Sequence, residues 1–408
     1  MCGICGVFHE PTAVRRDLDR VVRGMTDRLA HRGPDGQGRC GGPGYCVGHR
    51  RLGIIDLSHG AQPMASPDGR YVLVYNGEIY NYLELRQQLI QGGVTFCTFS
   101  DTEVLLRALI EKGPAALGDF NGMFALALVD RQTGEWLLAR DPIGIKPLYY
   151  AVAGGDLVFA SEIKALLVHP GVEAKLDGMG FGQYLTFQFC LHGRTLFEGI
   201  SAVEPGCYLR GRGGAILETV RYWDTGYQVD EHHTDAYFKD RLLYLLEDSA
   251  RLQIRSDVPL GAYLSGGIDS SAVASMAGEH LGRSIPVFHG RFAEGPAYDE
   301  SEHARAVARW IDADYHEVVP SAQEFVDLIP RLIYHMDEPV AGPGLFPQYV
   351  VSRLAAERVK VALGGQGGDE IFGGYARYLI GYLEQAIKGA VFQTQEEGRH
   401  IVTLASII

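Results

Sequence analysis

The sequence has little that suits a secreted, membrane-spanning or nucleic-acid-binding protein. It contains no N-x-S/T glycosylation sequon, no basic segment leading into an apolar one at its start, and no apolar run near the ~20 residues that span a bilayer. Basic charge is scarce, because 37 Lys and Arg face 50 Asp and Glu, for a net charge of −13. Seven irregularly spaced cysteines make no disulfide framework. We expect a cytoplasmic protein with no membrane and no nucleic acid as partner.

The length of the chain indicates two domains, which we place at 1–225 and 226–408. With 408 residues, 46% of them hydrophobic and 21% charged, the chain is a globular protein too long for one ordinary core. The first part has a helical pattern over 15–29 and several short apolar segments separated by turn residues. These segments predict an α+β domain of stacked antiparallel sheets, with strands over 4–8, 71–75, 123–129, 135–139, 148–152 and 157–160.

The pattern of apolar residues is different in the second part. Strand-like segments at 261–264, 285–289, 315–319 and 359–363 alternate with helical ones at 235–253, 272–281, 301–311 and 324–336. Strands that alternate with helices are typical of an α/β domain with a doubly wound parallel sheet.

Cys2 is the first candidate for chemistry. If the initiator methionine is removed, Cys2 carries both a nucleophilic thiol and an α-amine that can accept its proton. An ordinary cysteine near a frayed end is the alternative. A metal or redox pair with Cys5 is a weaker one, because no second CxxC is present to complete a zinc site.

Three patches in the first part could complete a cysteine amidase. The Asn76 side-chain amide and the Gly77 backbone N–H follow a predicted strand and could stabilise an oxyanion. Arg51 could bind an α-carboxylate and Asp101 an α-ammonium, through charge-assisted hydrogen bonds. Taken singly, the alternatives are a hairpin turn at 76–77, a solvated charge at Arg51 and a helix N-cap at Asp101.

In the second part, the segment Ser265-Gly-Gly-Ile-Asp-Ser-Ser271 lies at the end of a predicted parallel strand, where such sheets bind ligands. Its glycines, serines and following helix N-terminus suit a phosphate group. Asp269 would fit beside phosphate if it helps to hold Mg²⁺. The segment is neither a Walker A loop nor a G-x-S-x-G elbow, and a simple glycine-rich turn is the alternative.

The first part resembles the class II, N-terminal nucleophile glutamine amidotransferases. The resemblance rests on the runs MCGICGVF, HRGPDGQG, HRRLGIIDLSHGAQPM, YNGEIYN, SDTE, NGMFALALVD, RDPIGIKPLYY and FASEIKAL. It implies that Cys2 is the nucleophile and that Asn76 and Gly77 form the oxyanion hole. It also implies a glutamine pocket formed by Arg51, Asn76, Gly77, Glu78 and Asp101.

The second part resembles the ATP pyrophosphatases and, with SDVPLGAYL, YDES, YHMDEPV and GGQGGDEIFGGY, the glutamine-hydrolysing asparagine synthetases. The resemblance implies a site for ATP and pyrophosphate at Leu264, Ser265, Gly266, Gly267, Asp269, Ser270, Ser271, His289, Gly364 and Gly365. Gln366 and Asp369 would face the aspartyl-adenylate, and Asp269 and Asp369 would hold Mg²⁺.

The function implied by the two resemblances is that of an ATP-dependent C–N ligase in asparagine biosynthesis. Glutamine would be hydrolysed to glutamate and ammonia in the first domain. The second would adenylate aspartate with Mg-ATP, and ammonia would release asparagine, AMP and pyrophosphate. Glutamine, aspartate and ATP are thus the expected small-molecule partners, and a homodimer is an assembly to test.

Two departures from the family leave alternatives open. Several relatives have a glutamate where this chain has Gln366, and glutamine cannot accept a proton as a carboxylate does. The resemblance also fades after Tyr378, and the apolar end at 401–408 leads us to expect a chain truncated at its C-terminus. The alternatives are an amidotransferase acting on another carboxylate, and a glutaminase or nucleotide-binding module without synthetase activity. A β-lactam synthetase is disfavoured, because such relatives generally lack the cysteine at position 2.

Overall fold

The computed structural model of the chain describes residues 1–11, 17–226, 228, 230, 232–295, 298–339, 342 and 344–392. The chain forms two compact units. Unit 1 holds residues 1–259 and 320–350, and unit 2 holds 260–319 and the residues from 351 onward. The apolar end at 401–408 and the start of the helix predicted over 15–29 lie outside the described residues.

Cys2 directly precedes a strand in the middle of the first sheet of unit 1. Its antiparallel strands follow the order β10 (Ile200–Ala202), β8 (Tyr149–Ala153), β9 (Asp156–Ala160), β1 (Gly3–His9), β3 (Tyr45–Arg51), β2 (Gly36–Gly42). Strand β1 is central, because it pairs with β3 on one side and with β9 on the other. The strand that follows Cys2 is therefore held on both of its sides.

The second sheet of unit 1 carries Asn76 and Gly77. Its strands, also antiparallel, follow the order β12 (Ala215–Arg221), β11 (Cys207–Arg212), β7 (Glu135–Arg140), β6 (Gly122–Asp130), β5 (Tyr71–Ile79), β4 (Met64–Ala65). Strand β5 runs on past the predicted end of the strand at residue 75, so residues 76 and 77 lie inside it. The expectation that they follow a strand is wrong, because both pair with β6.

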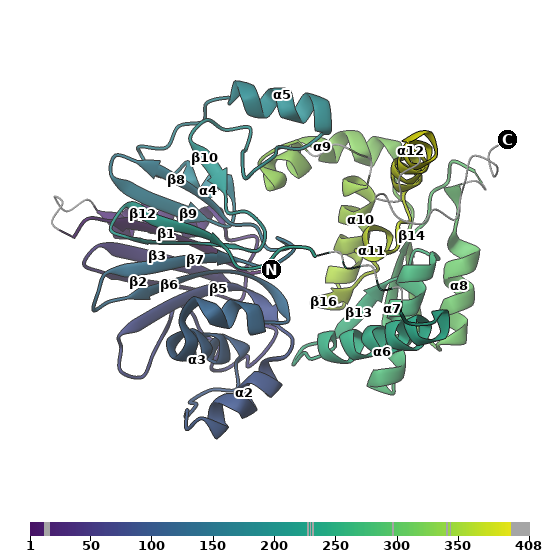
Figure 1. Cartoon of the computed structure of the whole chain (residues 1–408), viewed down its shortest axis with the longest axis horizontal. Helices are drawn as coiled ribbons and strands as arrows, with labels where there is room; N and C mark the ends of the chain where they lie inside the picture. The colour runs from purple at the N-terminus through teal and green to yellow at the C-terminus, as the bar shows by residue number, and fades with distance from the viewer. Residues whose placement is uncertain are drawn as a thin grey trace. The chain divides into compact units, whose positions relative to one another are not determined.

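Three apolar cores separate four layers in unit 1. One core lies between the sheets, with Phe8 and Phe159 from the first and Val74 and Trp136 from the second. A second lies between the β5–β6 sheet and the helices α2 (Tyr82–Gln91) and α3 (Asp101–Lys112), which Figure 1 shows beside those strands. The third lies between the first sheet and the helices α1 (Leu18–Arg28) and α4 (Ile163–Leu166). The predicted α+β class with stacked antiparallel sheets is thus confirmed.

The start of α3 corrects one local prediction. Ser100 is the N-cap, because its hydroxyl accepts a hydrogen bond from the backbone N–H of Thr102 (3.1 Å). Asp101 is the first residue of the helix, with a side chain 5% exposed. A carboxylate in the first turn suits the helix dipole, and the side chain remains free for another role.

The remaining elements of unit 1 are mostly helices. They are η1 (Gly113–Asp119, a 3₁₀-helix), α5 (Gly178–Phe187), α6 (Asp235–Gln253) and α9 (Ala322–Met336). Helix α10 (Leu345–Ala356) begins in unit 1 and continues into unit 2. Among the described residues, we find no helix that is both long and apolar enough to cross a membrane.

Unit 2 is built on a parallel sheet, which confirms the α/β prediction. Its strands follow the order β15 (Asp314–Val318), β14 (Pro286–Gly290), β13 (Leu260–Tyr263), β16 (Val361–Leu363). The chain moves from β13 outward to β15 and then returns to the other side of β13. The helices of this unit are α7 (Ile268–Leu281), α8 (Ser301–Trp310), α11 (Gly368–Phe372) and α12 (Ala376–Phe392).

That return creates a topological switch point between β13 and β16. Doubly wound sheets bind ligands outside the carboxyl ends of the strands at such a point. The loops that follow these two strands are 264–267 and 364–367. These are the segments in which the sequence predicts the nucleotide site.

Candidate functional site

Cys2 lies at the start of β1 with its sulfur against the backbone of Leu52. The Leu52 N–H donates to the sulfur (3.3 Å), and the thiol contacts the Leu52 carbonyl oxygen at 3.6 Å. Burial raises the pKa of the Cys2 thiol, and the Leu52 hydrogen bond opposes this. The thiol therefore needs a base to become a thiolate near neutral pH.

A base of the right kind lies at the same place. Burial lowers the pKa of the Met1 α-amine to about 5, and the positive charges of Arg32 and Lys146 add to the effect. An amine in this environment is neutral at pH 7. If Met1 is removed, the backbone nitrogen of Cys2 becomes the N-terminal α-amine.

Three charged side chains share the surroundings of the thiol. Lys146 is 4% exposed, and its ammonium contacts the Met1 sulfur at 3.2 Å. Burial lowers the pKa of Lys146 to about 8, against the attraction of Glu78. Burial, together with the charge of Asp101, raises the pKa of Glu78 to about 7. The two acids therefore repel each other, and a bound cation would relieve that repulsion.

Asn76 is the most informative residue of the site. Its side chain is 1% exposed, yet neither its amide nitrogen nor its amide oxygen has a hydrogen-bond partner among the described residues. Leaving a buried polar group unpaired costs about 1–3 kcal/mol. An amide kept in this state is available to a ligand that enters the site.

Gly77 presents its backbone to the same region. Its partner across the sheet is Phe124, whose own N–H and C=O bond to Asp141 on the far side of β6 (3.2 and 2.8 Å). In an antiparallel pair this register directs the N–H of Gly77 away from β6. Strand β4 pairs only with residues 72 and 73, so no strand of the described part of the chain covers that edge at Gly77. A side chain here would come within 2.1 Å of the Met123 carbonyl oxygen, so glycine is required.

Arg51 and Asp101 are both held by neighbouring backbone. The Arg51 guanidinium donates to the carbonyl oxygens of Asp56 (2.7 Å) and Leu57 (2.8 Å). One Asp101 oxygen accepts from the Tyr75 hydroxyl (3.0 Å) and the Ile79 N–H (3.2 Å). Burial raises the pKa of Asp101, and these hydrogen bonds oppose the rise. Both groups are thus fixed in place and retain hydrogen-bonding capacity for a ligand.

Sequence reasoning missed four residues that contact Cys2 or hold its neighbours in place. Arg32 donates to the Cys2 carbonyl oxygen (2.8 Å) and to Glu162 (2.8 Å). Lys146 and Leu52 make the contacts described above. All four lie within sequence runs that carry the family resemblance, HRGPDGQG, HRRLGIIDLSHGAQPM, RDPIGIKPLYY and FASEIKAL, which was the available signal.

The predicted phosphate loop of unit 2 is a compact turn between β13 and α7. The Ser265 N–H donates to the Ser270 hydroxyl (3.2 Å), and the two hydroxyls lie 2.9 Å apart. The Ser271 hydroxyl donates to the Gly267 carbonyl (2.6 Å). Gly266 has a φ of +97°, which only glycine adopts readily. The serine hydroxyls therefore bind groups of the turn itself, and the turn needs glycine at position 266.

The second predicted loop packs directly on the first. A Cβ at Gly365 would lie 2.7 Å from the Ser270 nitrogen, and one at Gly368 would lie 2.3 Å from an Asp269 carboxylate oxygen. Leu264 is buried, and its carbonyl accepts from His289 Nδ1 (2.8 Å). The other ring nitrogen of His289 is buried without a partner among the described residues. Gly364 lies at the start of this second loop, where Gln366 and Asp369 are exposed.

The acidic residues of unit 2 suit a hard cation that also binds phosphate. Asp269 and Asp369 follow the two strands at the switch point. No cluster of three or more His, Cys, Asp or Glu side chains that could hold a metal ion occurs within the described ranges. Mg²⁺ in nucleotide sites usually takes one or two carboxylates and completes its shell with phosphate oxygens and water. The residues present fit that mode of binding.

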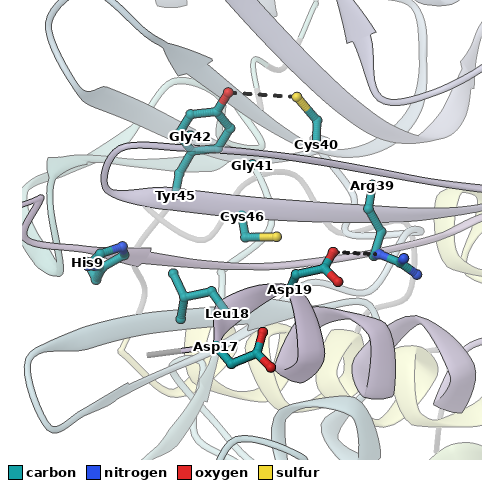
Figure 2. A pocket seen from close by; sticks show the side chains of 10 residues that line it. All are labelled: His9, Asp17, Leu18, Asp19, Arg39, Cys40, Gly41, Gly42, Tyr45 and Cys46. Carbon is teal, nitrogen blue, oxygen red and sulfur yellow. Dashed lines mark hydrogen bonds and ion pairs between the residues drawn. The ribbon is translucent and has the colours of Figure 1, made fainter. Parts of the chain in front are cut away.

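A cavity of about 510 Å³ lies elsewhere, beside α1, β2 and β3 (Figure 2). The ion pair of Arg39 with Asp19 (3.1 Å) and the contact of Cys40 with the Tyr45 hydroxyl (3.7 Å) lie in its lining. It contains none of the predicted site residues. We assign it no role.

Comparisons with known proteins match both parts of the chain to families. Residues 1–223 match the family model of a glutamine amidotransferase domain, and residues 241–402 match that of asparagine synthase. Glutamine-hydrolyzing asparagine synthetase 1 of Bacillus subtilis (strain 168) is 37% identical, over 93% of this chain and 59% of that protein. Asparagine synthetase B of Escherichia coli (strain K12) is 34% identical, over 92% of this chain and 65% of that protein.

This chain covers a larger share of a third relative. A putative asparagine synthetase of Methanocaldococcus jannaschii is 32% identical, over 95% of this chain and 78% of that protein. The chain therefore combines a glutamine amidotransferase domain with an asparagine synthase domain. The chain belongs to the family of glutamine-hydrolysing asparagine synthetases. It spans about three fifths of the length of the Bacillus subtilis relative and of three mycobacterial relatives.

Proposed function

We propose that the first domain, residues 1–225, is a glutaminase whose nucleophile is Cys2. After removal of Met1, the α-amine of Cys2 takes the thiol proton, and the sulfur attacks the side-chain amide of glutamine. The Asn76 amide and the Gly77 N–H stabilise the oxyanion that forms. Ammonia leaves, and water then releases glutamate from the thioester.

Substrate recognition in this proposal rests on charge. Arg51 binds the α-carboxylate of glutamine, while Asp101 and Glu78 bind its α-ammonium. The mutual repulsion of the two acids supports this assignment, because a cation between them lowers the energy of both.

We propose that the second domain, from residue 226 onward, adenylates the β-carboxylate of aspartate with ATP. The loop 265–271 holds the pyrophosphate, Leu264, His289, Gly364 and Gly365 lie against the nucleotide, and Gln366 and Asp369 face the aspartyl-adenylate. Asp269 and Asp369 would hold Mg²⁺, which would neutralise phosphate charge. Ammonia attacks the adenylate to give asparagine and AMP. The protein would act in the cytoplasm, and a homodimer is the assembly that we propose to test.

The observation that carries the glutaminase proposal is the buried, unpaired amide of Asn76 beside the free edge of β5 at Gly77. For the synthetase proposal it is the close packing of Gly365 and Gly368 against Asp269 and Ser270 beside the switch point.

One reaction tests both proposals. Purified protein is given glutamine, aspartate and Mg-ATP, and glutamate, pyrophosphate and asparagine are quantified together, beside a Cys2→Ala variant. Asparagine and pyrophosphate in equal amounts, lost in the variant with glutamine but retained with ammonia, are the expected result. Glutamate alone would refute the synthetase half for this chain. Pyrophosphate with a different carboxylate, and none with aspartate, would refute aspartate as the acceptor and favour the role of Gln366 in acceptor choice.

A further inference from the structure

A chain of four buried charges connects Cys2 with Asp337, a residue 335 positions further along the sequence. Arg32 donates to the Cys2 carbonyl oxygen (2.8 Å) and pairs with Glu162 (2.8 Å). The other oxygen of Glu162 accepts from Lys164 (2.5 Å), and Lys164 pairs with Asp337 (3.0 Å). The path runs entirely within unit 1.

The four side chains are 6–8% exposed, and their two positive and two negative charges balance. Burial alone would raise the pKa of Glu162, but hydrogen bonds from His31, Lys164 and Arg32 lower it to about 2. Each member therefore depends on its neighbour for its charge to be compensated.

Asp337 also orders the backbone next to Cys2. It accepts hydrogen bonds from the N–H groups of Ile163 (2.7 Å) and Lys164 (3.2 Å) at the start of α4. The residue just before Glu162 is Ser161, whose hydroxyl accepts from the Ile4 N–H (3.0 Å) and whose N–H donates to the Ile4 carbonyl (2.9 Å). The segment 161–164 thus binds Asp337 at one end and β1 at the other.

We propose that Asp337 and Lys164 are positioning residues for Cys2. They act through Glu162 and Arg32, which fix the carbonyl of the nucleophilic residue and hence the direction of its thiol. The inference rests on the proposed glutaminase. Because Asp337 has no contact with Arg51 or Asp101, its loss should disturb the nucleophile and leave glutamine recognition intact.

The test compares Asp337→Asn with Asp327→Asn in the full chain. Asp327 is an exposed acid on α9, so its variant controls for the loss of a carboxylate from the same segment. Glutamate release is measured over a range of glutamine concentrations. We expect kcat of Asp337→Asn to fall by about 10- to 100-fold, since small misplacements of a reacting group have costs of this size. KM for glutamine should stay within about twofold, and Asp327→Asn should match the wild type.

A double-mutant cycle separates positioning from general damage. Residues that act in series give non-additive losses, so Lys164→Met/Asp337→Asn should lose no more kcat than the worse single variant. Losses that multiply, or that appear in KM, would overturn the proposal. Should Asp337→Asn not fold, Lys164→Arg keeps all four charges but changes the geometry, and it should lower kcat several-fold.

The outcomes also distinguish this inference from the function on which it rests. A wild-type chain that releases no glutamate refutes the glutaminase and the inference together. An active wild type whose folded Asp337→Asn or Lys164→Arg variant keeps full kcat refutes the inference alone.

Discussion

Replacing Asn76 by alanine should lower activity and raise stability at the same time. The amide is 1% exposed, and both of its polar atoms lack partners among the described residues. Alanine removes two unpaired buried groups, each of which costs about 1–3 kcal/mol, in exchange for a small loss of packing. We therefore expect the free energy of unfolding to rise by about 1–2 kcal/mol.

The same substitution removes one donor to the proposed oxyanion. Loss of such a donor lowers kcat by about 10²- to 10³-fold, or roughly 3–4 kcal/mol of transition-state stabilisation. Urea denaturation at pH 7 and glutamate release under saturating glutamine measure the two effects on the same preparation.

Asn81→Ala is a matched control. The Asn81 amide donates to the Asp119 carbonyl (3.0 Å) and accepts from the Asn121 N–H (3.0 Å), so its loss removes two satisfied hydrogen bonds. We expect this variant to lose about 1–2 kcal/mol of stability and to keep its kcat. If Asn76→Ala is destabilised as much as Asn81→Ala, or keeps kcat within tenfold, the argument from the unpaired amide is refuted.

Three further predictions concern ionisable groups. The pKa of Glu78 is raised to about 7, so its side chain is mostly protonated and neutral below that pH. We expect kcat/KM for glutamine to fall as the pH drops through 7. Glu78→Gln should give a low kcat/KM that does not change with pH. The depressed pKa of Glu162 stabilises the fold fully above its ordinary value of 4.5, and about 3 kcal/mol should be lost as the pH falls from 4.5 to about 2, measured by urea denaturation. Asp269→Asn should weaken Mg-ATP binding at least tenfold in calorimetry, because it removes a proposed cation ligand.

Each of these three predictions has a control variant and a result that would contradict it. Glu111→Gln, on the exposed side of α3, should leave the pH profile unchanged, and a profile retained in Glu78→Gln would assign the titration to another group. Glu198→Gln breaks an exposed pair with Lys175 and should not alter acid stability, whereas Glu162→Gln should remove its acid-dependent part. Glu279→Gln, an exposed acid on α7, should bind Mg-ATP normally, and equal binding by Asp269→Asn would count against the cation site.

The strands of the parallel sheet and many elements of unit 1 could be predicted from local sequence, but β2, β3, β4, β10, β11 and β12 were not. Helix α6 begins and ends at the predicted residues, and the strands of the parallel sheet lie within two residues of expectation. In these helices and strands, the spacing of the apolar residues indicates which face is buried. The class of both domains follows from the same patterns, because alternating strands and helices require a parallel sheet and short consecutive strands favour antiparallel ones.

Two predictions from local sequence were wrong, the turn at 76–77 and the N-cap at Asp101. Strand pairing decided the first, and a neighbouring N-cap residue decided the second. Asn-Gly is a strong turn signal, yet Asn76 and Gly77 continue β5 because Ala125 and Phe124 of β6 pair with them. Asp101 is a good N-cap residue, but Ser100 takes that position and leaves the carboxylate in the first turn.

The sequence by itself identified the candidate nucleophile and the candidate phosphate loop, since each lies in a short contiguous segment. It also gave the class and order of the two parts, since each has its own pattern of apolar residues. Only the tertiary structure revealed that the Asn76 amide is unpaired and that Arg32, Glu162, Lys164 and Asp337 form one chain of charges. These properties depend on which groups meet after folding. A hydrogen bond or ion pair between residues more than a hundred positions apart has no periodicity and leaves no local pattern from which it could be predicted.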